Sequence, residues 1–135
     1  MNQEPISRSI GWVEILTPEG SLTKVRYDIF VSYLFKLQSF DLMQLHGALG
    51  VAGEAGELAD AIKKHVIYGK TLDRLNVIEE LGDLRFYMQA LMNLYQIDEQ
   101  TVLQYNARKL GERYKGMVYS DEDAIARADK GIPNE

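Results

Sequence analysis

No cysteine occurs in the chain, which excludes disulfide-stapled scaffolds and metal sites built on thiolates. The two histidines, His46 and His65, do not stand three residues after a glutamate, the spacing that a di-iron carboxylate bundle uses. No run approaches the roughly 20 apolar residues that a membrane-spanning helix needs. The first residues, MNQEPISRSIGW, lack the basic and then apolar order of a signal peptide. These absences favour a cytoplasmic protein with no membrane partner.

Positive charge is also scarce, because 15 lysines and arginines stand against 20 aspartates and glutamates, for a net charge of −5. That balance argues against broad contact with a nucleic-acid backbone. A protein of this charge that handles phosphates is expected to recruit divalent cations. The length of 135 residues and a hydrophobic content of 46% suit a globular core. We therefore expect one globular protein with no nucleic-acid partner.

Apolar residues recur at helical spacing through most of the chain. The pattern predicts helices over 27–40, from 42 or 49 to 68, over 72–95 and over 98–114, and a short one from Ser120 toward Gly131. Asp98 and Ser120 are expected as N-caps, and Gly69 as a C-terminal stop. Two apolar pieces around a Pro-Glu-Gly turn make 1–22 an arm or small hairpin. The expected fold is all-α, a four- to five-helix bundle over 23–135 preceded by that arm.

Two pairs of carboxylates stand at helical i, i+3 spacing, so each pair shares one helix face. Glu54 and Glu57 border the apolar stripe of the second predicted helix. At about 100° per residue, Glu80 falls inside the apolar arc of the third helix and Asp83 at its edge. If the two helices pack antiparallel, four carboxylates converge, which is unfavourable unless a cation joins them. Oxygen-only ligands suit Mg²⁺ or Mn²⁺; the alternative is an ordinary solvated acidic face.

Glycines recur every third residue at Gly47, Gly50, Gly53 and Gly56. Each glycine inside a helix costs about 0.5–1 kcal/mol relative to alanine. We therefore expect either a non-helical start to this segment or a close approach by another backbone or a ligand. Tight packing between two helices and contact with a phosphate explain such an approach equally well.

The fourth predicted helix carries an amide and two cations on one face, at Asn106, Lys109 and Arg113. These are the donors that a phosphate-bearing ligand needs, because arginine makes paired contacts with oxygens and lysine acts as a point charge. The alternative is a solvated helix end, where cations favour the C-terminal dipole.

Two longer stretches, GVAGEAGELADAIKKHVIYGKTLDRLNVIEELGDLRFYMQAL and NARKLGERY, carry a family resemblance. Together they resemble the MazG-like family of all-α nucleoside triphosphate pyrophosphohydrolases, whose ExxE and ExxD motifs match the two acidic pairs. Between Glu57 and Glu80 lie 22 residues. The resemblance runs from about Tyr33 to Asp129 and includes the closing segment YSDEDAIARAD, whereas 1–22 match no part of the family.

The resemblance implies Mg²⁺-dependent hydrolysis of nucleoside triphosphates to the monophosphate and pyrophosphate, in the cleaning of nucleotide pools. Carried over by position, the metal ligands are Glu54, Glu57, Glu80 and Asp83, with Glu57 and Glu80 as catalytic candidates. Spacing does not decide which carboxylate is the general base, although we name Glu57. The phosphate-binding candidates are Asn106, Lys109 and Arg113, and more weakly Lys63, Lys64 and Arg127. The resemblance and the surplus of apolar helix surface both predict a homodimer or homotetramer.

Two other functions remain open on the sequence. One is a pyrophosphohydrolase of the same fold that acts on phosphoribosyl-ATP, or specifically on dUTP or dCTP. The other is a non-catalytic helical interaction module whose acids bind nothing. Glu80 within the apolar arc argues against the second, because a surface acid without a role would face water.

Overall fold

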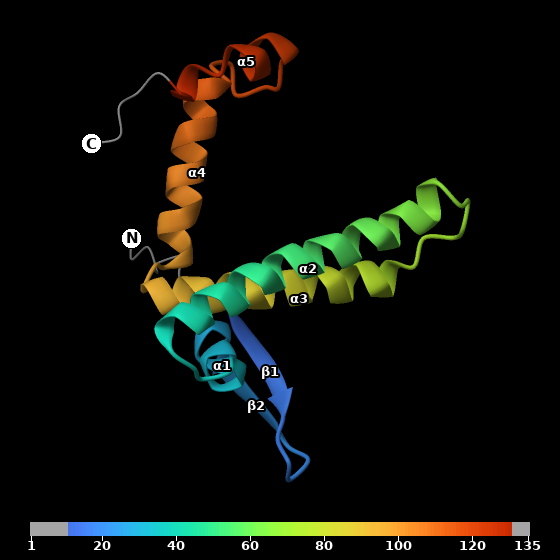
Figure 1. The fold of residues 1–135 in the computed structure, drawn as a ribbon, viewed down its shortest axis with the longest axis vertical. Helices are drawn as coiled ribbons and strands as arrows, with labels where there is room; N and C mark the ends of the chain where they lie inside the picture. Colours follow the sequence, from blue (N-terminus) through green and yellow to red (C-terminus); the bar gives the residue numbers. More distant parts are fainter. Residues whose placement is uncertain (1–10, 131–135) are drawn as a thin grey trace, which may run out of the picture. The chain divides into compact units, whose positions relative to one another are not determined.

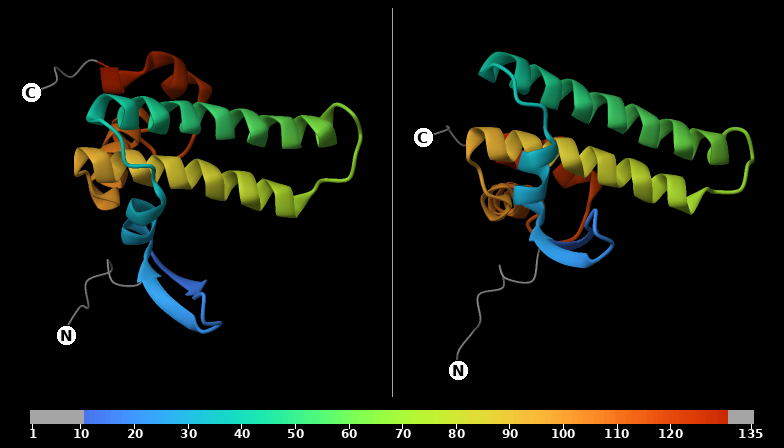
Figure 2. Two further views of the ribbon diagram at one scale, coloured as in Figure 1. Left: turned by 60° about the horizontal axis from the view of Figure 1, so that its bottom comes forward. Right: turned by 90° about the horizontal axis from the view of Figure 1, so that it is seen from below.

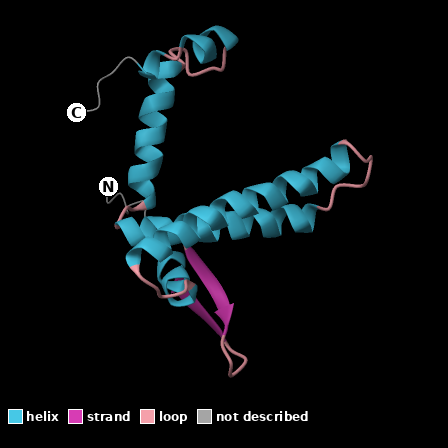
Figure 3. Ribbon diagram, in the orientation of Figure 1, coloured by secondary structure: helices cyan, strands magenta, loops and turns pink. Residues whose placement is uncertain are grey.

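The computed structural model describes residues 11–130. Within that range the elements are β1 (Trp12–Leu16), β2 (Leu22–Arg26), α1 (Tyr27–Leu34), α2 (Phe40–Val66), α3 (Arg74–Tyr95), α4 (Glu99–Arg113), α5 (Asp121–Ala126) and the 3₁₀ turn η2 (Ala128–Lys130). Figure 3 shows how strongly helix dominates over the one two-stranded sheet. The all-α prediction is confirmed, with five helices and a small hairpin as an addition. The chain divides into two compact units, Met1–Gln96 and Ile97–Glu135, which are described separately.

The first unit is built on α2 and α3, which lie side by side and antiparallel, joined by the loop of residues 67–73 (Figures 1 and 2). A Cβ added at Gly47 would lie 2.6 Å from Leu91 Cδ2, and one added at Gly50 would overlap the Tyr87 ring. These two glycines therefore let α3 side chains pack against the α2 backbone. Tight packing between two helices is thus the explanation at these two glycines, with side chains rather than a backbone making the approach. A non-helical start is wrong, because α2 is continuous across this segment.

The helix predicted over 27–40 is wrong in its length, because α1 ends at Leu34 and a new helix begins at Phe40. α1 ends because the backbone of Phe35 is extended (φ −72°, ψ 129°), and α2 begins after Ser39, which is also extended (φ −60°, ψ 155°). The Ser39 side chain accepts a hydrogen bond from the Leu42 N–H and so caps α2.

The hairpin β1–β2 is antiparallel, with Trp12 opposite Arg26 and Leu16 opposite Leu22. It extends four residues past the expected end of the arm, and residues 1–10 of that arm lie outside the described range. A buried polar chain anchors the following helix, α1, on α3. The buried Gln89 donates to Asn93 Oδ1 at 2.9 Å, and Asn93 Nδ2 donates to the Asp28 carbonyl at 2.8 Å. These hydrogen bonds satisfy the polar groups that the contact buries.

The second unit consists of α4, α5 and η2. Asp98 caps α4 by accepting from the Thr101 N–H at 2.8 Å, and Ser120 caps α5 by accepting from the Asp123 N–H at 3.1 Å. Both predicted N-caps are thus confirmed. The last helix is shorter than expected, because Arg127 adopts a left-handed conformation (φ 48°, ψ 52°) that ends α5 at Ala126. None of the described helices has the length and apolar content to cross a membrane.

Candidate metal centre

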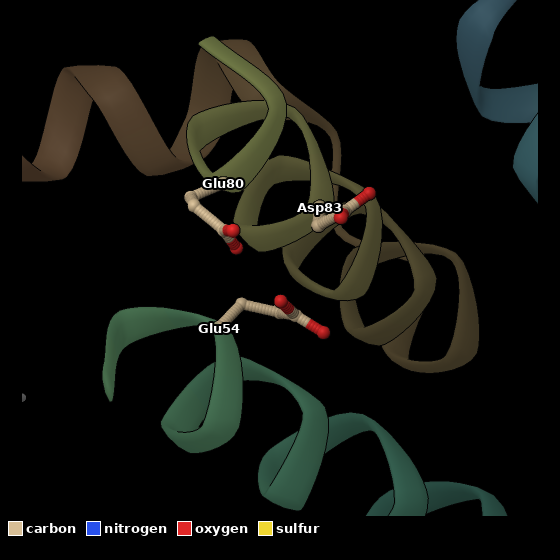
Figure 4. A group of neighbouring side chains, drawn as sticks. All are labelled: Glu54, Glu80 and Asp83. Atoms are coloured by element: carbon tan, nitrogen blue, oxygen red, sulfur yellow. The ribbon is translucent and has the colours of Figure 1, made fainter. Parts of the chain in front are cut away.

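Three carboxylates from α2 and α3 meet where the two helices face each other (Figure 4). Glu54 extends from α2 toward α3, and Glu80 and Asp83 stand on α3 one turn apart. One oxygen from each lies within 4.8 Å of the others. We call these three residues the acidic cluster. Antiparallel packing thus brings together three of the four predicted carboxylates, and their role as metal ligands stays a prediction.

The fourth carboxylate, Glu57, is exposed and lies outside the acidic cluster. It stands one turn after Glu54 on the same helix, so its charge still acts on Glu80. The structure therefore separates the four acids into three that converge and one that flanks them.

The acidic cluster concentrates negative charge without a matching cation. Partial burial raises the pKa of Glu80, and the carboxylates of Glu54, Glu57 and Asp83 raise it further. Across residues 11–130, no lysine or arginine forms an ion pair with any member of the cluster. Three carboxylates within reach of one another form an oxygen-only donor set for a hard divalent cation. The residues present therefore fit such an ion.

Lys63 and Lys64 lie farther along α2, and both are engaged by Asp60. Lys63 Nζ is 2.7 Å and Lys64 Nζ 2.8 Å from the two Asp60 oxygens, in exposed pairs. The two lysines hold the pKa of Asp60 at about 2. The pKa of Lys64 is raised, mainly by Asp60 and to a smaller degree by Glu57 and Glu80. Lys64 therefore lies within electrostatic reach of the acidic cluster. Asp60, the partner of both lysines, was not among the predicted site residues.

The predicted phosphate-binding face of α4 contains two different environments. Asn106 and Lys109 are exposed, and neither makes a side-chain hydrogen bond or ion pair within the described chain. Arg113 is bound through Nε and Nη2 to the two carboxylate oxygens of Asp129, at 2.7 and 2.8 Å. Arg127, the weaker candidate, is exposed at the end of α5.

Asp129 is a residue that sequence reasoning missed. Its carboxylate is fully buried, and the Arg113 guanidinium lowers its pKa to about 2. The pKa of Arg113 is raised in turn, first by Asp129. The single sequence signal for Asp129 was its place at the end of the segment that resembles the family's closing part.

Comparison with known proteins finds one family model and a phage protein whose sequences are similar to this chain. The family model described as "MazG nucleotide pyrophosphohydrolase domain" matches residues 45–118, more than half of the chain. The "Gene 37 protein" of Mycobacterium phage L5 is 35% identical, over 56% of this chain and 70% of its own length. No solved structure matches the chain. The matched range contains the acidic cluster and all of α4, and leaves out the hairpin and Asp129.

Proposed function

The chain belongs to the MazG nucleotide pyrophosphohydrolase domain family, and on that premise we propose that it hydrolyses nucleoside triphosphates to the monophosphate and pyrophosphate. The observation that carries the proposal is the acidic cluster, three converging carboxylates without an ion-pair partner in the described chain. Mg²⁺, or Mn²⁺ in its place, is the cation that such oxygens prefer. A hydrolase of this kind would act in clearing surplus or non-standard nucleotides from the cytoplasm.

The acidic cluster supplies the ligands in this proposal, and Glu57 stands one turn after Glu54 on α2. Glu54, Glu80 and Asp83 would hold a divalent cation, which would supply activation of the attacking water and neutralisation of phosphate charge. We assign the proton of the attacking water to Glu57, because it flanks the acidic cluster without being one of its three converging carboxylates. The new bond joins the water oxygen to the α-phosphorus, and the bond to the bridging oxygen breaks, releasing pyrophosphate.

The cations and amide of α4 are proposed to hold the phosphates. Asn106 and Lys109 are exposed and unengaged in the described chain, so their donors are available to a ligand. Arg113 supplies a guanidinium of fixed orientation. Lys63, Lys64 and Arg127 are further candidates, and Lys64 has the better support because it lies in the electrostatic field of Glu57 and Glu80.

The assembly that we propose is a homodimer or homotetramer. On α2, the large apolar side chains Leu42, Leu45 and Leu49 are 52, 54 and 62% exposed. They lie on a different side of the helix from Gly47 and Gly50, which face α3. Surface of this kind is typically covered by a second subunit. Sedimentation velocity should show a dimer or larger species at tens of micromolar, and a monomer at that concentration would contradict the assembly.

The proposed reaction is tested by product analysis on a panel of ribo- and deoxynucleoside triphosphates with Mg²⁺. We expect pyrophosphate and the monophosphate from at least one of them, and a panel that includes dUTP, dCTP and phosphoribosyl-ATP shows which substrate is preferred. Orthophosphate and a diphosphate as the sole products would contradict the cleavage position. Glu79→Gln is the matched control for variants of the site, because Glu79 is exposed and is not part of the acidic cluster.

A further inference from the structure

The second unit buries a charged pair while its apolar side chains remain exposed. On α4, Leu103 and Leu110 are 54 and 37% exposed. In contrast, the Asp129 side chain is 0% exposed and that of Arg113 only 16%. The contact that joins η2 to α4 is therefore centred on an ion pair rather than on apolar packing.

The geometry of this pair fixes the guanidinium. Both Asp129 oxygens accept hydrogen bonds, one from Nε and one from Nη2, in the paired arrangement that is specific to arginine. Two parallel hydrogen bonds determine the plane and the direction of the group, which a single bond would not do. Of the five N–H donors of arginine, three remain for other acceptors.

Burial of an ion pair is an inefficient way to stabilise a fold. The desolvation of both charges offsets their attraction, and apolar residues of similar size are often as stabilising or more so. A buried pair at this position therefore calls for a reason beyond the attachment of η2. Orientation of the guanidinium is such a reason, because an apolar pair could not provide it.

We propose that Asp129 is a positioning residue that holds the Arg113 guanidinium ready for the phosphates of a nucleotide. The inference rests on the proposed function, which assigns phosphate contacts to α4. Arg113 follows Asn106 by seven residues, or two turns, which separates them by about 10 Å on one helix face. That length matches a row of phosphate groups, and Lys109 stands between the two. Asp129 lies outside the range that the family model matches.

The test compares Asp129→Asn with Glu112→Gln in the full chain. Glu112 forms the exposed pair with Arg108 on the same helix, at 3.4 Å, so its variant removes the same charge from a pair that orients nothing. Calorimetric titration with inorganic tripolyphosphate measures binding without any need for turnover. We expect Asp129→Asn to weaken tripolyphosphate binding, and to raise KM, by about tenfold. We expect kcat to change less than KM, and Glu112→Gln to leave both unchanged.

A second comparison separates positioning from attachment of η2. In an Arg113→Gln background, Asp129→Asn should have no further effect on tripolyphosphate affinity, because its effect acts through the guanidinium. Equal losses in both backgrounds would overturn the proposal, as would an Asp129→Asn protein that binds tripolyphosphate like the wild type. A wild type that does not bind tripolyphosphate would overturn it too. If the wild type binds tripolyphosphate, loses affinity on Asp129→Asn and yet cleaves no nucleotide, the proposed function is refuted and the positioning role is left intact.

Discussion

The acidic cluster and the Arg113–Asp129 pair handle charge in opposite ways. Between α2 and α3, three carboxylates crowd together without an ion-pair partner in the described chain, and the pKa of Glu80 rises. At the end of α4, one carboxylate is fully buried and fully matched, and its pKa falls to about 2. In the pair the two side chains compensate each other's charge, and the guanidinium is held in a fixed orientation. In the acidic cluster the charge is left without a partner from the described chain, which is the feature that the proposed cation would neutralise.

The largest effect on turnover is expected from a substitution at Glu80, a member of the acidic cluster. Glu80→Gln should lower turnover in Mg²⁺ by about three orders of magnitude, because it removes a charged ligand oxygen. In chelator the same protein should melt no lower than the wild type, since the change relieves repulsion within the acidic cluster. Parallel assays of turnover and melting temperature check both parts, with Glu79→Gln as control.

A different pattern at Glu80 would assign it a structural role. If the carboxylate were held by the fold, Glu80→Gln would be destabilised in chelator and would keep near-normal turnover while folded. That pair of results would refute the metal assignment.

The next largest effect on turnover is expected at Glu57, which flanks the acidic cluster without belonging to it. Because Glu57 is the proposed proton acceptor, Glu57→Gln should lower kcat by about a hundredfold. Affinity for Mn²⁺ should change much less than in Glu80→Gln, since three converging ligands remain. Mn²⁺ affinity that falls equally in the two variants would make Glu57 a ligand and leave the base unassigned.

Acid should weaken the compensated pair in a defined window. The folded pKa of Asp129, about 2, lies below the ordinary value of 3.8 for an aspartate. A carboxyl with a depressed folded pKa contributes stability that is present above its unfolded pKa and is lost as pH falls through the folded value. Wild type should therefore be more stable than Asp129→Asn at pH 5, and the difference should shrink between about pH 4 and pH 2. Urea unfolding of both proteins at each pH measures it, and a difference that does not change with pH would contradict the pairing.

The smallest effects are expected at two glycines of α2. Gly50 packs against a side chain of α3, whereas Gly56 has open space beside it. Gly56 has nothing within 4 Å of an added Cβ, so Gly56→Ala should raise the free energy of unfolding by about 0.5–1 kcal/mol. Gly50→Ala should instead destabilise, because its Cβ would overlap the Tyr87 ring. Denaturant unfolding of the two variants compares them. A Gly50→Ala protein that gained stability like Gly56→Ala would show that α2 and α3 pack less closely than described.

Features that depend on neighbouring residues could be predicted from the sequence. The caps at Asp98 and Ser120 each involve a side chain and a backbone N–H three residues later, so local pattern was sufficient. The acidic cluster required one assumption, antiparallel packing of two adjacent helices, and the short loop between them made that assumption safe. The break between Leu34 and Phe40 could not be read from apolar spacing, which continues across it, although Ser39 is a residue type that often caps a new helix.

Features that depend on the return of a distant segment could not be predicted. Asp129 meets Arg113 from 16 residues away, after α5 and a left-handed residue have reversed the chain. Neither helical periodicity nor a motif encodes that return, so Arg113 was described by its face on α4 alone. The exposure of Glu57 had a similar cause. Sequence spacing places it on the face of Glu54, and the position of α3 decides which of the two acids meets Glu80.

The most direct test of the central claim is a Mn²⁺ titration of the full chain, followed by the electron paramagnetic resonance signal of free Mn²⁺. The account predicts that the wild type and Glu79→Gln both remove free Mn²⁺ from solution, and that Glu80→Gln removes much less at the same concentrations. Added Mg²⁺ should return the bound Mn²⁺ to solution by competition. Equal binding by the wild type and Glu80→Gln, or no binding by either, would contradict the claim that the acidic cluster holds a divalent cation.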